Sequence, residues 1–134
     1  MSAKPVFLVV DDSRLHHQMY MLVFAKGALA GSTLLHAKNG REGYALFTTH
    51  PEIEMVFLDL NMPEMNGLEV LTRRAAERLH PQVPIVLVTT ESSEDDEVRA
   101  RSAGAWDYLR KPFQPADVER LVARALAEAA GSAA

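Results

Sequence analysis

The residues of this sequence best suited to chemistry stand at the ends of short apolar runs. They are two acids in tandem, a third acid, a threonine and a lysine, namely Asp11, Asp12, Asp59, Thr89 and Lys111. In an open α/β sheet, ligands bind beyond the carboxyl ends of the strands, so we expect these side chains to meet at one rim. Three carboxylates in one crevice repel each other unless a positive charge lies among them. The pattern therefore predicts a cation site.

The expected ligands favour Mg²⁺ as that cation. They are carboxylate oxygens, the chain has no cysteine, and we expect no histidine beside the acids. Hard oxygen ligands suit Mg²⁺ better than Zn²⁺, and Mg²⁺ keeps water molecules that a phosphate oxygen can replace. A carboxylate such as Asp59 can attack phosphorus to form an acyl phosphate. The Lys111 ammonium and the Thr89 hydroxyl would each serve one phosphoryl oxygen.

Five stretches have the length and apolar content of strands that could position these residues. Three are continuous apolar runs, as expected for strands covered on both faces of a parallel sheet. These are residues 6–10, 55–58 and 85–88, and the two weaker stretches are 33–37 and 106–109.

Between the strands, the apolar spacing changes to the helical period. The stripes are Leu15, Met19, Leu22 and Val23; Leu68, Leu71, Ala75 and Leu79; and Val118, Leu121, Val122, Ala125 and Leu126. Residues 41–47 and 94–102 indicate two shorter helices. The strand–helix order, repeated five times, predicts an α/β fold with a doubly wound parallel sheet between two layers of helices.

Local signals agree with these helix boundaries. Glycines 27, 104 and 131 stand where helices should end, and Ser93 with Asp96 resembles a capping box. Residues 129–134 have the composition of a frayed tail.

Four motifs, in order and at these intervals, closely resemble the response-regulator receiver family, in particular its single-domain, chemotaxis-regulator-like members. They are VVDDS at 9–13, LDLNMPEMNG at 58–67, VTT at 88–90 and KPF at 111–113. The resemblance runs from about residue 6 to residue 126. It implies a flavodoxin-like (βα)5 three-layer sandwich with parallel strand order 2-1-3-4-5. A single receiver domain would then span 1–134, with its core at about 5–128.

Carried over residue by residue, the resemblance assigns roles at the acidic rim. It implies that Asp12, Asp59 and the backbone carbonyl of Asn61 bind Mg²⁺ directly, while Asp11 acts through water. Asp59 is the implied phosphoacceptor, and Lys111 the implied partner of the phosphoryl oxygens.

The resemblance also implies a conformational switch. Thr89 and Tyr108 match the family's switching pair, in which the threonine hydroxyl moves to the phosphoryl group and the aromatic ring turns inward. The face that changes would be the fourth helix, fifth strand and fifth helix. The peptide between Lys111 and Pro112 would be cis, a state that only about 5–6% of X–Pro bonds adopt in folded proteins.

Two residues depart from the family pattern. Thr90 occupies a position that is usually small, often alanine, on the route by which water and the phosphodonor reach the site. Trp106 stands where a polar residue is common. It either anchors a protein partner or buries itself over Val118 or Val98, because exposed aromatic side chains are enriched at interfaces but also pack readily into cores.

The composition limits the classes of function. The 134 residues suffice for one ordinary domain, with 48% hydrophobic and 24% charged residues as in soluble globular proteins. Lys plus Arg number 14 against 18 Asp plus Glu, a net charge of −4, which argues against direct nucleic-acid binding. No apolar stretch has the length of a signal-peptide core or a bilayer span. We therefore expect a cytoplasmic protein without membrane insertion.

Together these features predict a two-component response regulator. A histidine kinase or phosphotransfer protein would phosphorylate Asp59, and the altered face would bind an unidentified protein target. The chain would be no enzyme beyond catalysing its own phosphorylation and dephosphorylation, and would be a monomer or a weak phosphorylation-dependent dimer.

Two other functions are alternatives to this prediction. One alternative is a phosphorylation-independent interaction module. Another is an aspartyl-nucleophile phosphatase, which is disfavoured because Asn61 stands where a second acid would act. His16 and His17 are adjacent on a helix and diverge, so we expect both at the helix surface or boundary, as with the other three histidines.

Overall fold

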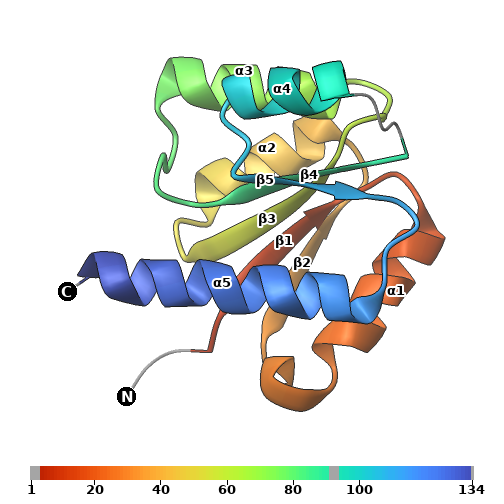
Figure 1. The fold of residues 1–134 in the computed structure, drawn as a ribbon. Helices are drawn as coiled ribbons and strands as arrows, with labels where there is room; N and C mark the ends of the chain where they lie inside the picture. Colours follow the sequence, from red (N-terminus) through yellow and green to blue (C-terminus); the bar gives the residue numbers. More distant parts are fainter. Residues whose placement is uncertain (1–3, 91–93, 134) are drawn as a thin grey trace.

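The computed structural model describes residues 4–90 and 94–133. Strands and helices alternate along the chain (Figure 1). The strands are β1 (Val6–Val10), β2 (Thr33–Ala37), β3 (Ile53–Asp59), β4 (Ile85–Thr89) and β5 (Asp107–Arg110). The helices are α1 (Arg14–Phe24), α2 (Gly40–Thr49), α3 (Gly67–Glu77), α4 (Glu94–Ser102) and α5 (Pro115–Ala133), with a short 3-10 turn η1 (Gly27–Leu29) after α1.

The five strands form one parallel sheet in the order β2-β1-β3-β4-β5, which confirms the predicted topology. Strand β1 pairs with β2 on one side and β3 on the other. Their apolar runs are continuous because both faces of the sheet are covered. Successive strands are added on opposite sides of β1, so the strand order reverses there, and a crevice is expected at the carboxyl ends of β1 and β3.

Two hydrophobic clusters fill the space between the sheet and its two layers of helices. Helices α2, α3 and α4 cover one face, while α1 and α5 cover the other (Figure 1). Because side chains alternate along a strand, neighbours on β1 serve opposite clusters. Leu8 packs toward the first cluster and Phe7 toward the second.

The predicted apolar stripe of α1 is partly wrong. Leu15 is 64% exposed and Leu22 is 65% exposed, whereas Tyr20 and Phe24 are buried. The Tyr20 ring lies 5.4 Å from the rings of both Phe57 and Phe113. The helix therefore turns its two large aromatic side chains into the core.

The predicted apolar stripe of α3 is also partly wrong. Ala75, which belongs to that stripe, is exposed, and the neighbouring Arg74 is buried instead. The Arg74 guanidinium donates hydrogen bonds to the backbone carbonyls of Leu79, His80 and Val83. These bonds give partners to carbonyl groups of the loop between α3 and β4 and to the guanidinium itself, which explains how a charged side chain is buried there.

The tail also differs from the prediction. Helix α5 continues to Ala133, so residues 129–133 of the stretch that was expected to fray are helical, and the helix passes Gly131, which was expected to end it. The last turns are rich in alanine, the strongest helix former, which compensates for one glycine. The predicted Ser93 capping box lies outside the described residues. Among residues 4–90 and 94–133, no helix combines the length and hydropathy needed to cross a bilayer.

Candidate functional site

Three carboxylates meet where β1 and β3 end side by side. Asp11 and Asp12 follow the last residue of β1, and Asp59 is the last residue of β3. Asp11 and Asp59 are 2% and 6% exposed, whereas Asp12 is exposed to solvent. One ligand oxygen from each carboxylate lies within 4.8 Å of the others. The sheet topology thus brings together the acids that the sequence predicted.

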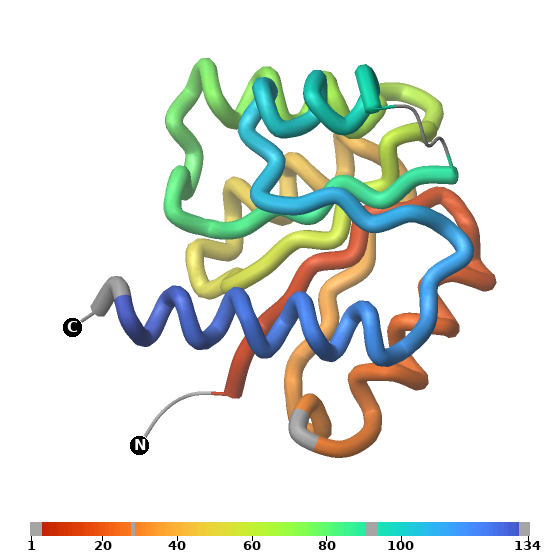
Figure 2. The backbone as a smooth tube through the Cα atoms, viewed as in Figure 1, coloured from red at the N-terminus to blue at the C-terminus, as the bar shows by residue number. Residues whose placement is uncertain are grey.

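Lys111 reaches this cluster from the end of β5. Its backbone N–H donates to the carbonyl of Thr89 at 2.7 Å, and the peptide between Lys111 and Pro112 is cis as predicted. The Lys111 Nζ atom lies 3.0 Å from Asp11 Oδ2 and 3.5 Å from Asp59 Oδ1. Its side chain is 8% exposed. The segment after β5 runs beside the start of α1 (Figure 2), and Lys111 on that segment contacts His16 on α1.

The surroundings of Asp59 disfavour its charged form. Burial raises the pKa of Asp59, and the nearby Asp11 and Asp12 carboxylates raise it further. The Lys111 ammonium and a hydrogen bond from the backbone of Asn61 oppose this increase in pKa without cancelling it. A cation placed among the carboxylates would relieve the repulsion that contributes to the shift.

His16 lies in the site, contrary to the expectation that no histidine would stand beside the acids. Its Nδ1 atom is 3.0 Å from Asp11 Oδ2 and 2.9 Å from Lys111 Nζ. The position follows from the first turn of α1, where Ser13 caps the helix by accepting a hydrogen bond from the His16 backbone N–H. The turn begins right after the acids, a sequence signal that could have located His16.

Two glycines allow the loop after Asp59 to fold back against the site. The Gly67 N–H donates to the carbonyl of Leu60 at 2.9 Å, and a Cβ atom at Gly67 would lie 2.7 Å from the Asp59 carbonyl oxygen. A Cβ atom at Gly40 would lie 1.9 Å from the carbonyl oxygen of Met65. Both contacts are closer than a side chain permits, so glycine is required at both positions.

The remaining predicted site residues lie at the same end of the sheet or near its last strand. Thr89 ends β4 and is fully buried, one position beyond the residue that pairs with Asp59. Asn61 is exposed in the loop after β3, and Tyr108 is half-buried on β5. The direct metal contact of the Asn61 carbonyl and the movement of Tyr108 stay predictions.

Trp106 is half-buried and held by α5. The Arg124 guanidinium stacks 4.2 Å above its ring centre, and its Nε1–H donates to Glu128 at 3.0 Å. The ring packs at the edge of the cluster that includes Val118. Of the two predictions for Trp106, burial against α5 describes the structure better than an unoccupied partner anchor.

The donor atoms present fit a hard divalent cation such as Mg²⁺. The cluster offers three carboxylates from Asp11, Asp12 and Asp59 against the single positive charge of Lys111, which leaves two negative charges uncompensated. Oxygen ligands with an exposed side, here at Asp12, suit an ion that keeps several waters.

Comparison with known proteins agrees with this geometry. The family model "Response regulator receiver domain" matches residues 7–123. A chemotaxis protein CheY homolog of Campylobacter jejuni is 36% identical over 108 residues, covering 81% of this chain and 82% of that protein. The chemotaxis protein CheY1 of Helicobacter pylori strain J99 is 32% identical, covering 81% of this chain and 86% of that protein.

Solved structures share the same fold. The chemotaxis protein CheY4 of Vibrio cholerae matches with a TM-score of 0.81 at 29% identity, covering 92% of this chain and 99% of that one. A CheY-like receiver domain protein of Methanospirillum hungatei matches with a TM-score of 0.82 at 26% identity, covering 94% and 96%. With the strand order, the acidic cluster and the family match in agreement, the chain belongs to the family of response regulator receiver domains.

Proposed function

We propose that this receiver domain is a Mg²⁺-dependent phosphorylation switch in which Asp59 accepts a phosphoryl group from a histidine kinase or a phosphotransfer protein. One observation carries the proposal. The buried Asp59 carboxylate lies at the carboxyl end of β3 beside two further carboxylates, with the Lys111 ammonium 3.5 Å from its Oδ1 atom. An anionic nucleophile and a cation for the incoming oxygens thus share one crevice.

In the proposed reaction, a carboxylate oxygen of Asp59 forms a bond to phosphorus while the phosphorus–nitrogen bond of the donor's phosphohistidine breaks. The Lys111 ammonium stabilises negative charge on the phosphoryl oxygens, and the Thr89 hydroxyl donates to another of them. Bound Mg²⁺ would supply further charge neutralisation, held by Asp12 and Asp59 directly and by Asp11 through water. The chain would catalyse only its own phosphorylation and dephosphorylation.

The signal would leave through the face formed by α4, β5 and α5. Thr89 ends β4, and the neighbouring strand β5 carries Tyr108, which pairs in register with Leu87. Movement of the Thr89 hydroxyl toward a phosphoryl group would open space for the half-buried Tyr108 ring. The protein target would sense that change, with the chain monomeric or weakly dimeric on phosphorylation. We place this reaction in the cytoplasm, as expected for the kinase partner.

Beryllofluoride, a phosphoryl mimic, tests the proposal in the intact protein. Adding it with Mg²⁺ should change the fluorescence of Trp106, the only tryptophan in the chain, because the residue lies on the face that moves. An Asp59→Asn protein should give no response, whereas a Glu54→Gln protein, altered at an exposed acid on the same strand, should respond like the parent.

Two outcomes would favour other functions. An equal response in the Asp59→Asn protein would refute phosphoacceptor chemistry and support a phosphorylation-independent interaction module. Sustained turnover of generic phosphate esters would instead point to a phosphatase.

A further inference from the structure

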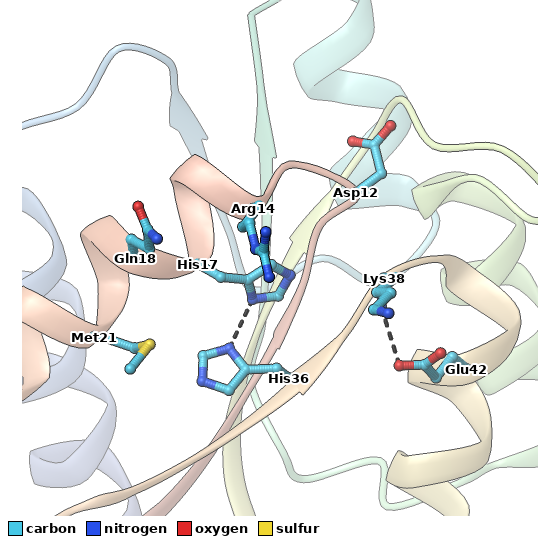
Figure 3. A pocket seen from close by; sticks show the side chains of 8 residues that line it. All are labelled: Asp12, Arg14, His17, Gln18, Met21, His36, Lys38 and Glu42. Carbon is cyan, nitrogen blue, oxygen red and sulfur yellow. Dashed lines mark hydrogen bonds between the residues drawn. The ribbon is translucent and has the colours of Figure 1, made fainter.

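Two histidines outside the acidic cluster point at each other from neighbouring elements. His17 belongs to α1 and His36 to β2, and their Nδ1 atoms are 2.7 Å apart (Figure 3). The ring centres lie 4.8 Å apart with an angle of 65° between the planes. The sequence analysis predicted surface or boundary positions for both, and it compared His17 only with the adjacent His16.

The second nitrogen of His17 is already committed. Its Nε2 atom lies 2.7 Å from the backbone carbonyl oxygen of Asp11. A carbonyl only accepts hydrogen bonds, so Nε2 carries the proton and, in the neutral ring, Nδ1 presents a lone pair toward His36. Metal-binding histidines almost always donate their other N–H to a carbonyl or carboxylate in this way, which fixes the tautomer and orients the ring.

His36 can supply a second lone pair. Partial burial and the neighbouring His17 lower the pKa of His36, which favours the neutral ring that binds metals. In the hydrogen-bonded pair of neutral rings, the His36 proton sits on Nδ1. Because His36 is exposed, solvent can carry that proton to Nε2 and leave Nδ1 available to a cation.

We propose that His17 and His36 form a second cation site, selective for divalent transition metals that prefer imidazole, such as Zn²⁺, Ni²⁺ or Cu²⁺. Zn–N bonds of about 2.0–2.1 Å at a tetrahedral angle place two ligand nitrogens about 3.3 Å apart. The observed 2.7 Å separation has to open by only about 0.6 Å, which rotation of the exposed His36 ring supplies. The metal then lies between the two Nδ1 atoms, and the His36 proton stays on Nε2.

The surroundings leave room for the remaining ligands. The pair lines a pocket of about 560 Å³ that opens to solvent beside α1 and β2. Its charged lining residues are Asp12, Arg14, Lys38 and Glu42, two of each sign, so the pocket as a whole does not repel a cation. Figure 3 shows the Asp12 carboxylate directed away from the histidine pair, so water molecules complete the coordination. Magnesium, which prefers oxygen ligands, does not compete for this site.

Isothermal calorimetry of the 134-residue chain with Zn²⁺, with excess Mg²⁺ present throughout, tests the proposal. His36→Gln should lower the affinity of one Zn²⁺-binding event by at least about tenfold, since loss of even an outer partner of a metal ligand costs that much. The exposed position of His36 makes a folding defect unexpected, and circular dichroism checks it. His17→Gln should remove the same event.

Two matched variants distinguish this site from the other histidines. His50→Gln removes an imidazole paired with Glu52, and His16→Gln removes the imidazole beside the acidic cluster. Both should retain the Zn²⁺-binding event that His36→Gln loses. The proposal is overturned if His36→Gln binds Zn²⁺ as tightly as the parent, or if His16→Gln or His50→Gln abolishes that event.

Discussion

Replacing Asp59 by asparagine should stabilise the Mg²⁺-free protein and remove most of its stabilisation by Mg²⁺. At an effective dielectric constant of about 20, two carboxylates with an oxygen within 4.8 Å of Asp59 each repel it by about 3.5 kcal/mol or more. Lys111 at 3.5 Å attracts Asp59 by about 4.7 kcal/mol. The two repulsions exceed the one attraction by about 2 kcal/mol, and desolvation of the 6% exposed Asp59 acts in the same direction as the repulsion.

The pH dependence follows from the same raised pKa. Burial and the neighbouring acids raise the pKa of Asp59 in the folded state, so the folded protein holds a proton that the unfolded chain has already lost. Stability therefore falls as pH rises from the ordinary aspartate pKa through the raised one. The gain from Asp59→Asn should be present above that window, at neutral pH, and disappear below it.

Urea unfolding followed by Trp106 fluorescence, in EDTA and in Mg²⁺, measures both effects. In EDTA at neutral pH, we expect Asp59→Asn to raise the free energy of unfolding by about 2 kcal/mol. Mg²⁺ at about 100 times its dissociation constant should raise the free energy of unfolding of the parent protein by about 2.7 kcal/mol, and that of the variant by much less. The reasoning is refuted if Asp59→Asn is less stable in EDTA, or if Mg²⁺ stabilises both proteins equally.

Four further substitutions test other parts of the structure, each by urea unfolding. Gly67→Ala should lower the free energy of unfolding by about 1–3 kcal/mol and abolish the beryllofluoride response, because the alanine Cβ would lie 2.7 Å from the Asp59 carbonyl oxygen. As a control, Gly131→Ala, in a helix with open space around it, should raise the free energy of unfolding by about 0.5–1 kcal/mol. Equal effects of the two substitutions would contradict the close-approach argument. Although partial burial raises the pKa of Asp107, hydrogen bonds from Arg124 and a backbone amide hold that pKa below the ordinary value. Asp107→Asn should therefore lower the free energy of unfolding by roughly 1 kcal/mol at neutral pH, and by nothing once the pH falls below the lowered pKa. A loss of stability that does not depend on pH would argue against ion pairing. Arg74→Met should cost about 2–3 kcal/mol because it leaves three loop carbonyls without their donor, and an unchanged midpoint would show that water replaces the guanidinium.

The sheet and the meeting of the acids could be predicted from sequence because both depend on local patterns. Apolar runs identify buried parallel strands, and polar residues at their carboxyl ends must then share one edge. Asp12 and Asp59 are far apart in sequence, yet the topology alone brings them together. The same reasoning placed Lys111 at the crevice.

The wrong predictions concern features that depend on how a helix is oriented about its axis and on which neighbouring elements it contacts. Leu15 and Leu22 fit a helical period, but α1 is oriented so that Tyr20 and Phe24 face the core. That orientation also turns His16 toward Asp11. Spacing along one helix cannot reveal a partner on another element.

Contacts between side chains that are distant in the sequence could not be predicted for the same reason. The contact of His17 with His36 joins a helix to a strand 19 residues later. Trp106 is covered by Arg124 from α5, a contact that depends on the packing of the last helix against β5.

The most direct test of phosphorylation at Asp59 is the intact mass of the protein after incubation with acetyl phosphate. With Mg²⁺ present, we predict a gain equal to one phosphoryl group, absent in EDTA and absent in the Asp59→Asn protein. A gain that persists in either condition, or no gain in the parent protein with Mg²⁺, would contradict the proposed role of this carboxylate.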